Sequence, residues 1–287
     1  MNIAEILSLT QTELKHLARS GFLSHLAIGH LAVMAVTVLL AWPAAVIPGA
    51  TAPALTWNWF NYVMLGTLTY VALALASEMI PIPGRVPSFE WVYYGVARPL
   101  NVLVARTLST LLLLLILAAL SAPIGVLAHA AVAVPPARVL GAAAVTATLS
   151  LCALAAGLYI GTGVADPAMR AVAANSLYIA GLALALVVGG WIGPLAERGI
   201  ALLNPLGAMH HFLNPQAAET SSHFPWTGWT VLYGLVVVTL FALAHARLWE
   251  WLPGRGPASR KRVPKVSDPP SEKEWDEAAP PSRGEPR

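Results

Sequence analysis

The chain has 287 residues, of which 57% are apolar and only 11% are charged, with a formal net charge of +3. Soluble domains carry roughly a quarter of their residues as charged side chains. The mean hydropathy of +0.65 is instead typical of a polytopic membrane protein. The composition therefore argues against a soluble globular enzyme and a disordered chain. A disulfide-stapled secreted protein is excluded because Cys152 is the single cysteine.

The N-terminal segment 1–22 predicts an amphipathic helix. Its apolar residues recur at steps of three to four, with Glu13, Lys15 and Arg19 between them. The charges, and the lack of a small-residue cleavage site behind a short apolar core, argue against a signal peptide. We expect this helix to lie along the inner membrane surface. A frayed cytoplasmic tail is the alternative.

Long uncharged runs predict six transmembrane helices in an all-α integral membrane protein. Residues 20–77 contain no Asp, Glu, Lys or Arg, which is enough chain for two crossings of about 20 residues each. Prolines at 43, 48 and 53 mark the loop between these two crossings. With the later runs, the predicted spans lie near 23–47, 57–79, 104–133, 139–165, 171–196 and 225–248.

The basic residues orient these spans. If the N-terminus is cytoplasmic, four inner segments hold 15 of the 17 lysines and arginines: 1–22, 80–106, 166–170 and 247–287. The outer segments then hold only Arg138 and Arg198. Because cytoplasmic loops carry an excess of Lys and Arg, we expect both termini to lie inside. Residues 251–287, rich in Pro, Gly, Ser and charge, are predicted to form a disordered cytoplasmic tail.

Several common sources of chemistry are missing from the sequence. No Gly-Lys dipeptide is present, so the chain lacks the usual P-loop for ATP. The His-Glu-x-x-His zinc motif and the Gly-x-Ser-x-Gly nucleophile motif are absent as well. No charged residue falls in the middle of a predicted span, which disfavours a proton or ion relay. We therefore expect no catalytic residue, metal or cofactor on this chain, and no nucleic-acid partner.

The predicted cytoplasmic loop between spans two and three contains a short helix signal. Ser88 after Pro87 favours a helix start, and Pro99 favours its end, which predicts a helix near 88–98. This helix would carry aromatic and charged side chains. They suit docking onto another protein and equally suit anchoring in lipid through Trp91, Tyr93 and Tyr94.

The order of these features resembles the membrane subunit of type-2 ABC transporters. The matching features are the amphipathic first helix, Glu78 after span two, the run Ser88-Phe89-Glu90-Trp91 with Arg98-Pro99, and Arg106-Thr107-Leu108-Ser109 at the start of span three. The layout covers most of residues 10–250, and the motif about 30 of them. This chain departs from the family in having Glu78 alone for an Arg-Glu pair, and Ser88 where a glycine is common.

The resemblance implies a role for the segment near 88–98. In the family such a segment is the coupling helix that contacts a separate P-loop ATPase, here through Glu78, Ser88, Phe89, Glu90, Trp91 and Arg98. ATP and Mg would be bound by that partner chain. The resemblance further implies a second permease subunit, identical or related, surrounding lipid, and a multi-pass location in a bacterial or archaeal cytoplasmic (inner) membrane. The expected activity is export of an unidentified substrate.

The predicted outer segment near 197–222 is too short and broken to cross the bilayer. Asn-Pro steps at Asn204-Pro205 and Asn214-Pro215 indicate interfacial or re-entrant half-helices, with an ordinary outer loop as the alternative. The family resemblance favours re-entrant helices, which makes these four residues candidates for an outer gate.

Polar side chains inside the spans are the remaining candidates. Asn61, Thr67 and Asn175 are candidates for the transport pathway. Small residues at Ala153, Gly157 and Gly161 predict close packing of two helices.

Histidines provide the alternatives. Met209-His210-His211 with His223 could bind a soft metal, although interfacial histidines without a ligand are the simpler interpretation. Span histidines could instead serve a membrane haem-handling or redox protein: His25, His30, His129 and His245. A non-catalytic membrane assembly factor is the third hypothesis.

Overall fold

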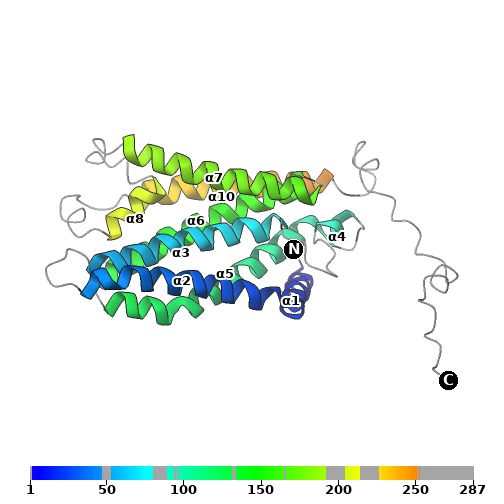
Figure 1. The fold of residues 1–287 in the computed structure, drawn as a ribbon. Coiled ribbons are helices and arrows are strands. Elements are labelled where there is room, and N and C mark those ends of the chain that lie inside the picture. Colours follow the sequence, from blue (N-terminus) through cyan, green and yellow to red (C-terminus); the bar gives the residue numbers. More distant parts are fainter. Residues whose placement is uncertain are drawn as a thin grey trace, which may run out of the picture.

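The structure is a computed structural model that describes residues 2–46, 53–79, 89–93, 95, 97–130, 134–164, 166–191, 204–213, 226–250 and 252. Every regular element in these residues is an α-helix, so the predicted all-α class is confirmed (Figure 1). The helices are α1 (Ile3–Arg19), α2 (Phe22–Val46), α3 (Pro53–Ala76), α4 (Glu90–Tyr93), α5 (Pro99–Ala130), α6 (Pro136–Gly163), α7 (Pro167–Trp191), α8 (Pro205–Leu213) and α10 (Trp226–Glu250). The predicted tail, 251–287, lies outside the described residues except for Leu252.

Five of the described helices are long and apolar enough to cross a membrane: Phe22–Trp42, Leu55–Ala76, Pro99–Ala130, Pro136–Gly163 and Trp226–Glu250. The chain is therefore a multi-pass membrane protein by length and composition of its helices. Helix α7 lies over the predicted fifth span, but its side chains after residue 184 fall outside the described residues. A sixth crossing stays a prediction.

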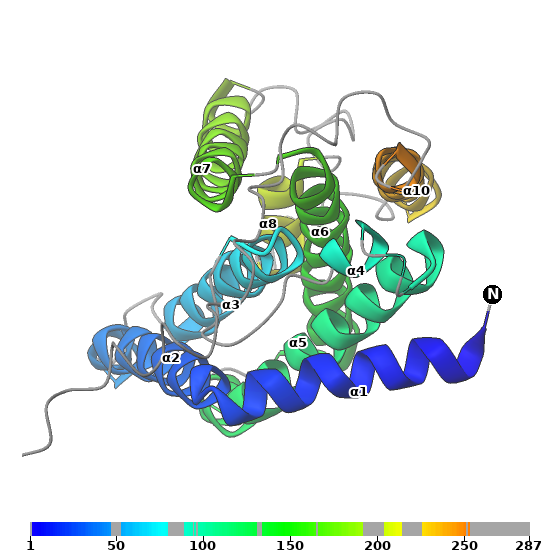
Figure 2. The same cartoon turned by 90° about the vertical axis from the view of Figure 1, so that its right-hand side faces the viewer.

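The long helices run alongside one another as a bundle, and α1 lies across one end of it (Figures 1 and 2). Helix α4 is at this same end, and α8 is at the opposite end. We call them the α1 end and the α8 end. The face of α1 that packs on the bundle repeats at helical spacing and consists of Ile6, Thr10, Glu13 and Leu17. A helix that lies across the spans is oriented as expected for one parallel to a membrane surface.

Helix α5 begins earlier than the predicted start at residue 104. Pro99, which was expected to end the short helix before it, is instead the first residue of α5. Proline suits that position because its missing N–H would have no partner inside the helix. The Glu5 carboxylate also caps this helix start, accepting from the backbone N–H of Arg98 at 3.2 Å and from Nδ2 of Asn101 at 2.6 Å.

Helices α3 and α6 cross closely over small residues, as the sequence predicted. A Cβ on Gly157 would lie 2.6 Å from the Leu73 carbonyl oxygen and 2.8 Å from Cβ of Ala76. A Cβ on Gly161 would lie 2.5 Å from a ring carbon of Phe89. Glycine at these two positions is what allows α3 and the residue preceding α4 to pack directly on α6.

Two buried apolar clusters fill the bundle. The cluster toward the α1 end joins α3, α5, α6 and α10 with the α4 segment and includes Leu75, Phe89, Leu103, Leu158 and Leu248. The cluster toward the α8 end includes Met34, Trp57, Val145, Met209 and Trp229. Helix α3 contributes to both clusters, so it connects the two ends of the molecule.

The crossing at Gly157 makes a stability prediction. Replacing Gly157 by Ala should destabilise the protein by about 1–3 kcal/mol. The added methyl would clash with a backbone carbonyl, which cannot move without shifting α3. Thermal unfolding of the detergent-purified variants would measure the effect. Gly181→Ala is the matched control, since its Cβ has no atom within 4 Å. Equal melting temperatures for the two variants would contradict the packing account.

Candidate functional site

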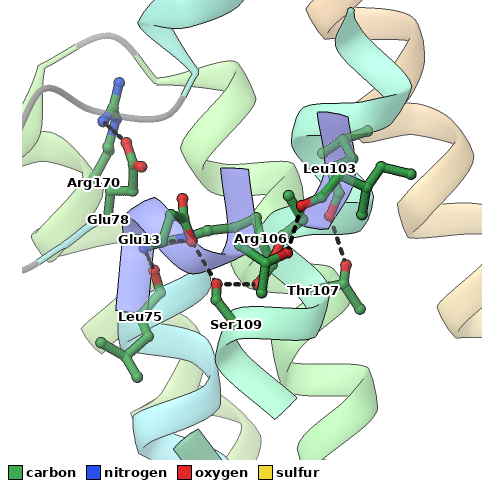
Figure 3. A network of polar contacts seen from close by, with 11 residues as sticks. Glu13, Leu75, Glu78, Leu103, Arg106, Thr107, Ser109 and Arg170 are labelled. Carbon is green, nitrogen blue, oxygen red and sulfur yellow. Dashed lines mark hydrogen bonds and ion pairs between the residues drawn. The ribbon is translucent and has the colours of Figure 1, made fainter. Parts of the chain in front are cut away.

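The α1 end contains a fully buried ion pair. Arg106 of α5 and Glu13 of α1 are 2% and 1% exposed, with Arg106 Nη1 lying 3.2 Å from Glu13 Oε2. The other terminal nitrogen of Arg106 donates to the Leu75 carbonyl of α3, and the Ser109 hydroxyl donates to the same carboxylate (Figure 3). One guanidinium therefore joins α1, α3 and α5.

This arrangement satisfies two charges that are costly to bury. Removing a carboxylate and a guanidinium from water costs several kcal/mol per ion, and hydrogen bonds to both groups are needed to offset that cost. The Leu75 carbonyl lies in the last turn of α3, where the helix dipole favours a cation such as Arg106. Loss of either ion would leave the other buried without its counter-charge.

Glu78 closes the end of α3 in a backbone conformation that normally selects glycine. Its φ is +54°, and its N–H donates to the Leu75 carbonyl while the N–H of Met79 donates to the Ala74 carbonyl. These two bonds form the Schellman arrangement at a helix C-terminus. A side chain in this left-handed region costs about 1–2 kcal/mol.

The Glu78 carboxylate explains why a glycine is not used there. Its Oε2 lies 3.5 Å from Nη1 of Arg170, and both side chains are at most 5% exposed. Arg170, in the first turn of α7, also donates from Nε to the Val164 carbonyl at the end of α6 (2.5 Å). The pair ties the ends of α3, α6 and α7 together (Figure 3).

Glu90 brings a second carboxylate to this ion pair. Burial raises the pKa of the Glu90 carboxyl, the nearby Glu78 carboxylate raises it further, and Arg170 opposes the shift. The charges of Glu78 and Glu90 therefore both act on Arg170 beside α4.

The predicted coupling helix is shorter than expected. It spans Glu90–Tyr93, one turn, instead of 88–98, and the described residues after it, Gly95, Ala97 and Arg98, are not helical. Gly95 has a φ of +69°, and its N–H donates to the Val92 carbonyl, which turns the chain out of the helix. Ser88 lies outside the described residues.

The candidate coupling residues differ in their access to a partner. Phe89 is fully buried against α6, so it anchors the segment and is not available to another protein. Glu78 is buried as well. Glu90 and Trp91 are partly exposed and Arg98 is exposed, so these three can contact a partner.

A groove of about 450 Å³ lies between α2, α3 and α7. Of the three predicted pathway residues, one lines it and a second contacts its lining. Thr67 lines it, and Asn175 accepts a hydrogen bond from the hydroxyl of Tyr70, another lining residue, at 3.2 Å. Asn61 does not line it; its amide donates to the Trp57 carbonyl on its own helix at 2.8 Å.

Two tyrosines, Tyr70 of α3 and Tyr178 of α7, line the groove where these helices meet. The rings of Tyr70 and Tyr178 meet edge to face with centroids 5.1 Å apart. The Tyr178 hydroxyl donates to the Gly66 carbonyl of α3 at 3.1 Å. These contacts hold α7 against α3 and give the groove a polar rim in an otherwise apolar lining.

At the α8 end, a short helix lies within the predicted outer segment. Asn204 caps it, accepting from the Leu206 N–H at 2.9 Å, and Pro205 is its first residue. Ala208 and Met209 are fully buried in the apolar cluster of this end. Asn214 and Pro215 lie outside the described residues, so the gate prediction is not tested there.

The described histidines lie apart from one another except for two pairs on single helices, His25 with His30 and His210 with His211. No group of three or more His, Cys, Asp or Glu side chains in the described part of the chain could hold a metal ion. His223 lies outside it. His25 and His30 both line the groove, but they belong to one helix and cannot flank a planar macrocycle from opposite faces. His129 and His245 contact Trp57 and Trp249, respectively.

Comparison with known proteins identifies no relative. A scan against protein-family models finds no match, and searches of curated proteins and of solved structures find none either.

Sequence reasoning missed the partners that hold the α1 end together. Glu13 and Arg106 are 93 residues apart, and no local pattern pairs them. One signal was present: Glu13 falls on the same helical face as Ile6, Thr10 and Leu17. A charged residue on the packing face of an amphipathic helix indicates a buried counter-charge elsewhere in the chain.

The buried pair predicts a non-additive mutant cycle. Glu13→Gln should destabilise the protein by about 3–5 kcal/mol, because it leaves the Arg106 guanidinium buried without its counter-charge. Adding Arg106→Met should recover most of that loss. Thermal unfolding in detergent would measure Glu13→Gln, Arg106→Met and the double variant. Glu5→Gln is the control on the same helix, with an expected loss of only about 1 kcal/mol. A strictly additive cycle would contradict the assignment.

Proposed function

We propose that this chain is the permease subunit of a type-2 ABC transporter. In this proposal it has six spans with both termini inside, and it exports a substrate across a bacterial or archaeal cytoplasmic membrane. A separate P-loop ATPase hydrolyses ATP, and a second permease subunit completes the pathway. The observation that carries the proposal is the α1 end, where the partly exposed segment 89–98 is anchored by buried Phe89 and Val92 beside span ends that buried ion pairs join.

The segment from 89 to 98 has the properties of a mechanical link. Phe89 and Val92 anchor it in the apolar cluster, and both are fully buried. Glu5 fixes its other end through the Arg98 N–H. A force applied to Glu90 or Arg98 would therefore move α3, α5 and α6 together, since the packed core transmits displacement without yielding.

The chemistry of this segment supports a protein partner over lipid. It presents a carboxylate, Glu90, and anionic membrane surfaces repel such a group. Arg98, which is exposed nearby, provides a cation that can pair with a partner's carboxylate. Mixed charge with a half-buried Trp91 is typical of the anchor positions in protein interfaces.

The pathway in this proposal follows the groove between α2, α3 and α7. Apolar side chains on α2 and α7, such as Ile28 and Ile179, are about two-thirds exposed, at 67% and 65%. A second permease subunit on this face would enclose the groove. The haem-handling hypothesis has less support, because His25 and His30, the two histidines that line the groove, belong to one helix.

The proposal predicts the effect of a double substitution at the coupling segment. Glu90→Ala with Arg98→Ala should leave the melting temperature nearly unchanged but lower ATPase retention at least about tenfold, since interface arginines are often hot spots. Retention is measured as the ATPase chains that co-purify in mild detergent, counted by mass spectrometry. Arg138→Ala, at the α8 end, is the control and should keep full retention. Equal retention in both variants would contradict the coupling assignment.

A further inference from the structure

The surface of α1 that does not pack on the bundle carries an apolar stripe. Ile3 and Leu7 are 66% and 59% exposed, and Leu14, two turns after Leu7, is half-buried. Residues at these spacings lie along one line on a helix. A hollow of about 490 Å³ follows this line, and Leu7, Leu14 and Ala18 are among its lining residues. The stripe is thus open, on a helix that lies across the ends of the spans (Figures 1 and 2).

Contacts with α5 show which edge of α1 faces the bilayer. Residues 5 and 10 are about 140° apart around a helix. Glu5 accepts hydrogen bonds from Arg98 and Asn101, at the start of α5. The Thr10 hydroxyl, beside the stripe, lies 3.4 Å from the Ala105 carbonyl oxygen, one turn further into that span. The stripe is therefore on the bilayer side of α1, where the apolar residues of an interfacial helix enter the boundary between headgroups and acyl chains.

The charged side chains of α1 are divided between its two sides. Both carboxylates are used inside the protein, since Glu5 binds Asn101 and Glu13 binds Arg106. Lys15 and Arg19 are exposed, and neither has an ion pair among the described residues. Because the carboxylates of this helix are turned toward the bundle, its outer face is cationic beside the apolar stripe.

These two cations lie at the level of the phospholipid headgroups. Arg19 is three residues before Phe22, where the first span begins, so the two Cα atoms are at most about 11 Å apart. Lys15 is about 6 Å earlier on a helix that lies across the spans. The headgroup layer is about 5–8 Å thick. Lys and Arg extend their charged ends along apolar surface to reach such a layer.

We infer that the outer face of α1 binds an anionic phospholipid. Lys15 and Arg19 contact its phosphate, and Leu7 and Leu14 lie against the upper part of its acyl chains. A zwitterionic phospholipid offers the same chains but no net charge for the two cations to neutralise. An acidic protein surface would pair with the cations, but it would leave the stripe on the bilayer side of α1 without a partner.

This inference goes beyond the proposed transport function and does not depend on it. Lipid binding needs the chain in a bilayer and no ATPase. Its failure would leave the proposed coupling to an ATPase unaffected, and the absence of an ATPase would leave lipid binding unaffected. A bound lipid would hold α1 at the membrane surface and, through Glu13 and Arg106, the adjoining part of α5.

Phosphatidylglycerol with a diazirine near its headgroup is the probe. The purified full chain in phosphatidylcholine nanodiscs that contain this probe is irradiated, and labelled peptides are mapped by mass spectrometry. We expect label on residues 3–19, with unlabelled phosphatidylglycerol competing at least about tenfold more strongly than phosphatidylcholine, since each basic residue contributes about fivefold. Residues 226–238 of α10, which are uncharged and largely exposed, are the internal reference and should show no such preference.

Charge-removing and charge-keeping variants identify the groups responsible. Lys15→Gln with Arg19→Gln should abolish the preference at residues 3–19 and leave the melting temperature in detergent unchanged, because both side chains are exposed and unpaired. Lys15→Arg with Arg19→Lys keeps both charges and is the matched control, which should retain the wild-type preference. Salt at 1 M should weaken the preference in the wild type, because the Debye length falls to about 3 Å.

Three results would overturn the inference. The first is no label on residues 3–19, or equal competition there by the two lipids. The second is a preference that survives Lys15→Gln with Arg19→Gln. The third is a carbodiimide cross-link in the same nanodiscs from Lys15 to a carboxylate of this chain or of a second copy, which would show that protein covers this face of α1.

Discussion

The buried guanidinium of Arg106 constrains the arrangement of the whole α1 end. It needs a counter-charge and several acceptors away from water, and it finds them in Glu13 and the Leu75 carbonyl. Satisfying it fixes where α1 crosses the bundle and where α3 ends. The end of α3 in turn places Glu78 against Arg170, which fixes α7. Because α3 and α7 both line the groove, these contacts also set the positions of two of its walls.

Features that depend on local sequence could be predicted. Uncharged runs locate the long helices, the face of Ile6 and Leu17 predicts the amphipathic α1, and the spacing of Gly157 and Gly161 predicts a close crossing. Contacts between distant residues could not be predicted, because no local pattern pairs residues such as Tyr178 and Gly66, which are 112 residues apart. The left-handed backbone at Glu78 could not be predicted either, because glycine is the usual residue in this conformation at a helix C-terminus.

Helix α3 connects the two regions that the proposed transporter needs. Its middle, from Val63 to Val71, lines the groove, and its end at Glu78 meets the charges beside α4. A displacement of the segment around Glu90 would reach the groove through one rigid element, and α7 would follow through Arg170 and Tyr178. In the proposed mechanism, the segment 89–98 acts as a lever and the groove is the pathway, and α3 connects the two. ATP hydrolysis takes place on the partner ATPase.

The most direct test is to count the partners of the native protein. The tagged chain would be purified from its own cells in mild detergent, and the proteins that accompany it would be quantified by mass spectrometry. The account predicts a P-loop ATPase chain in a 1:1 ratio with the permease chains. Isolation of the chain alone, or with redox proteins and a haem absorbance band, would contradict it.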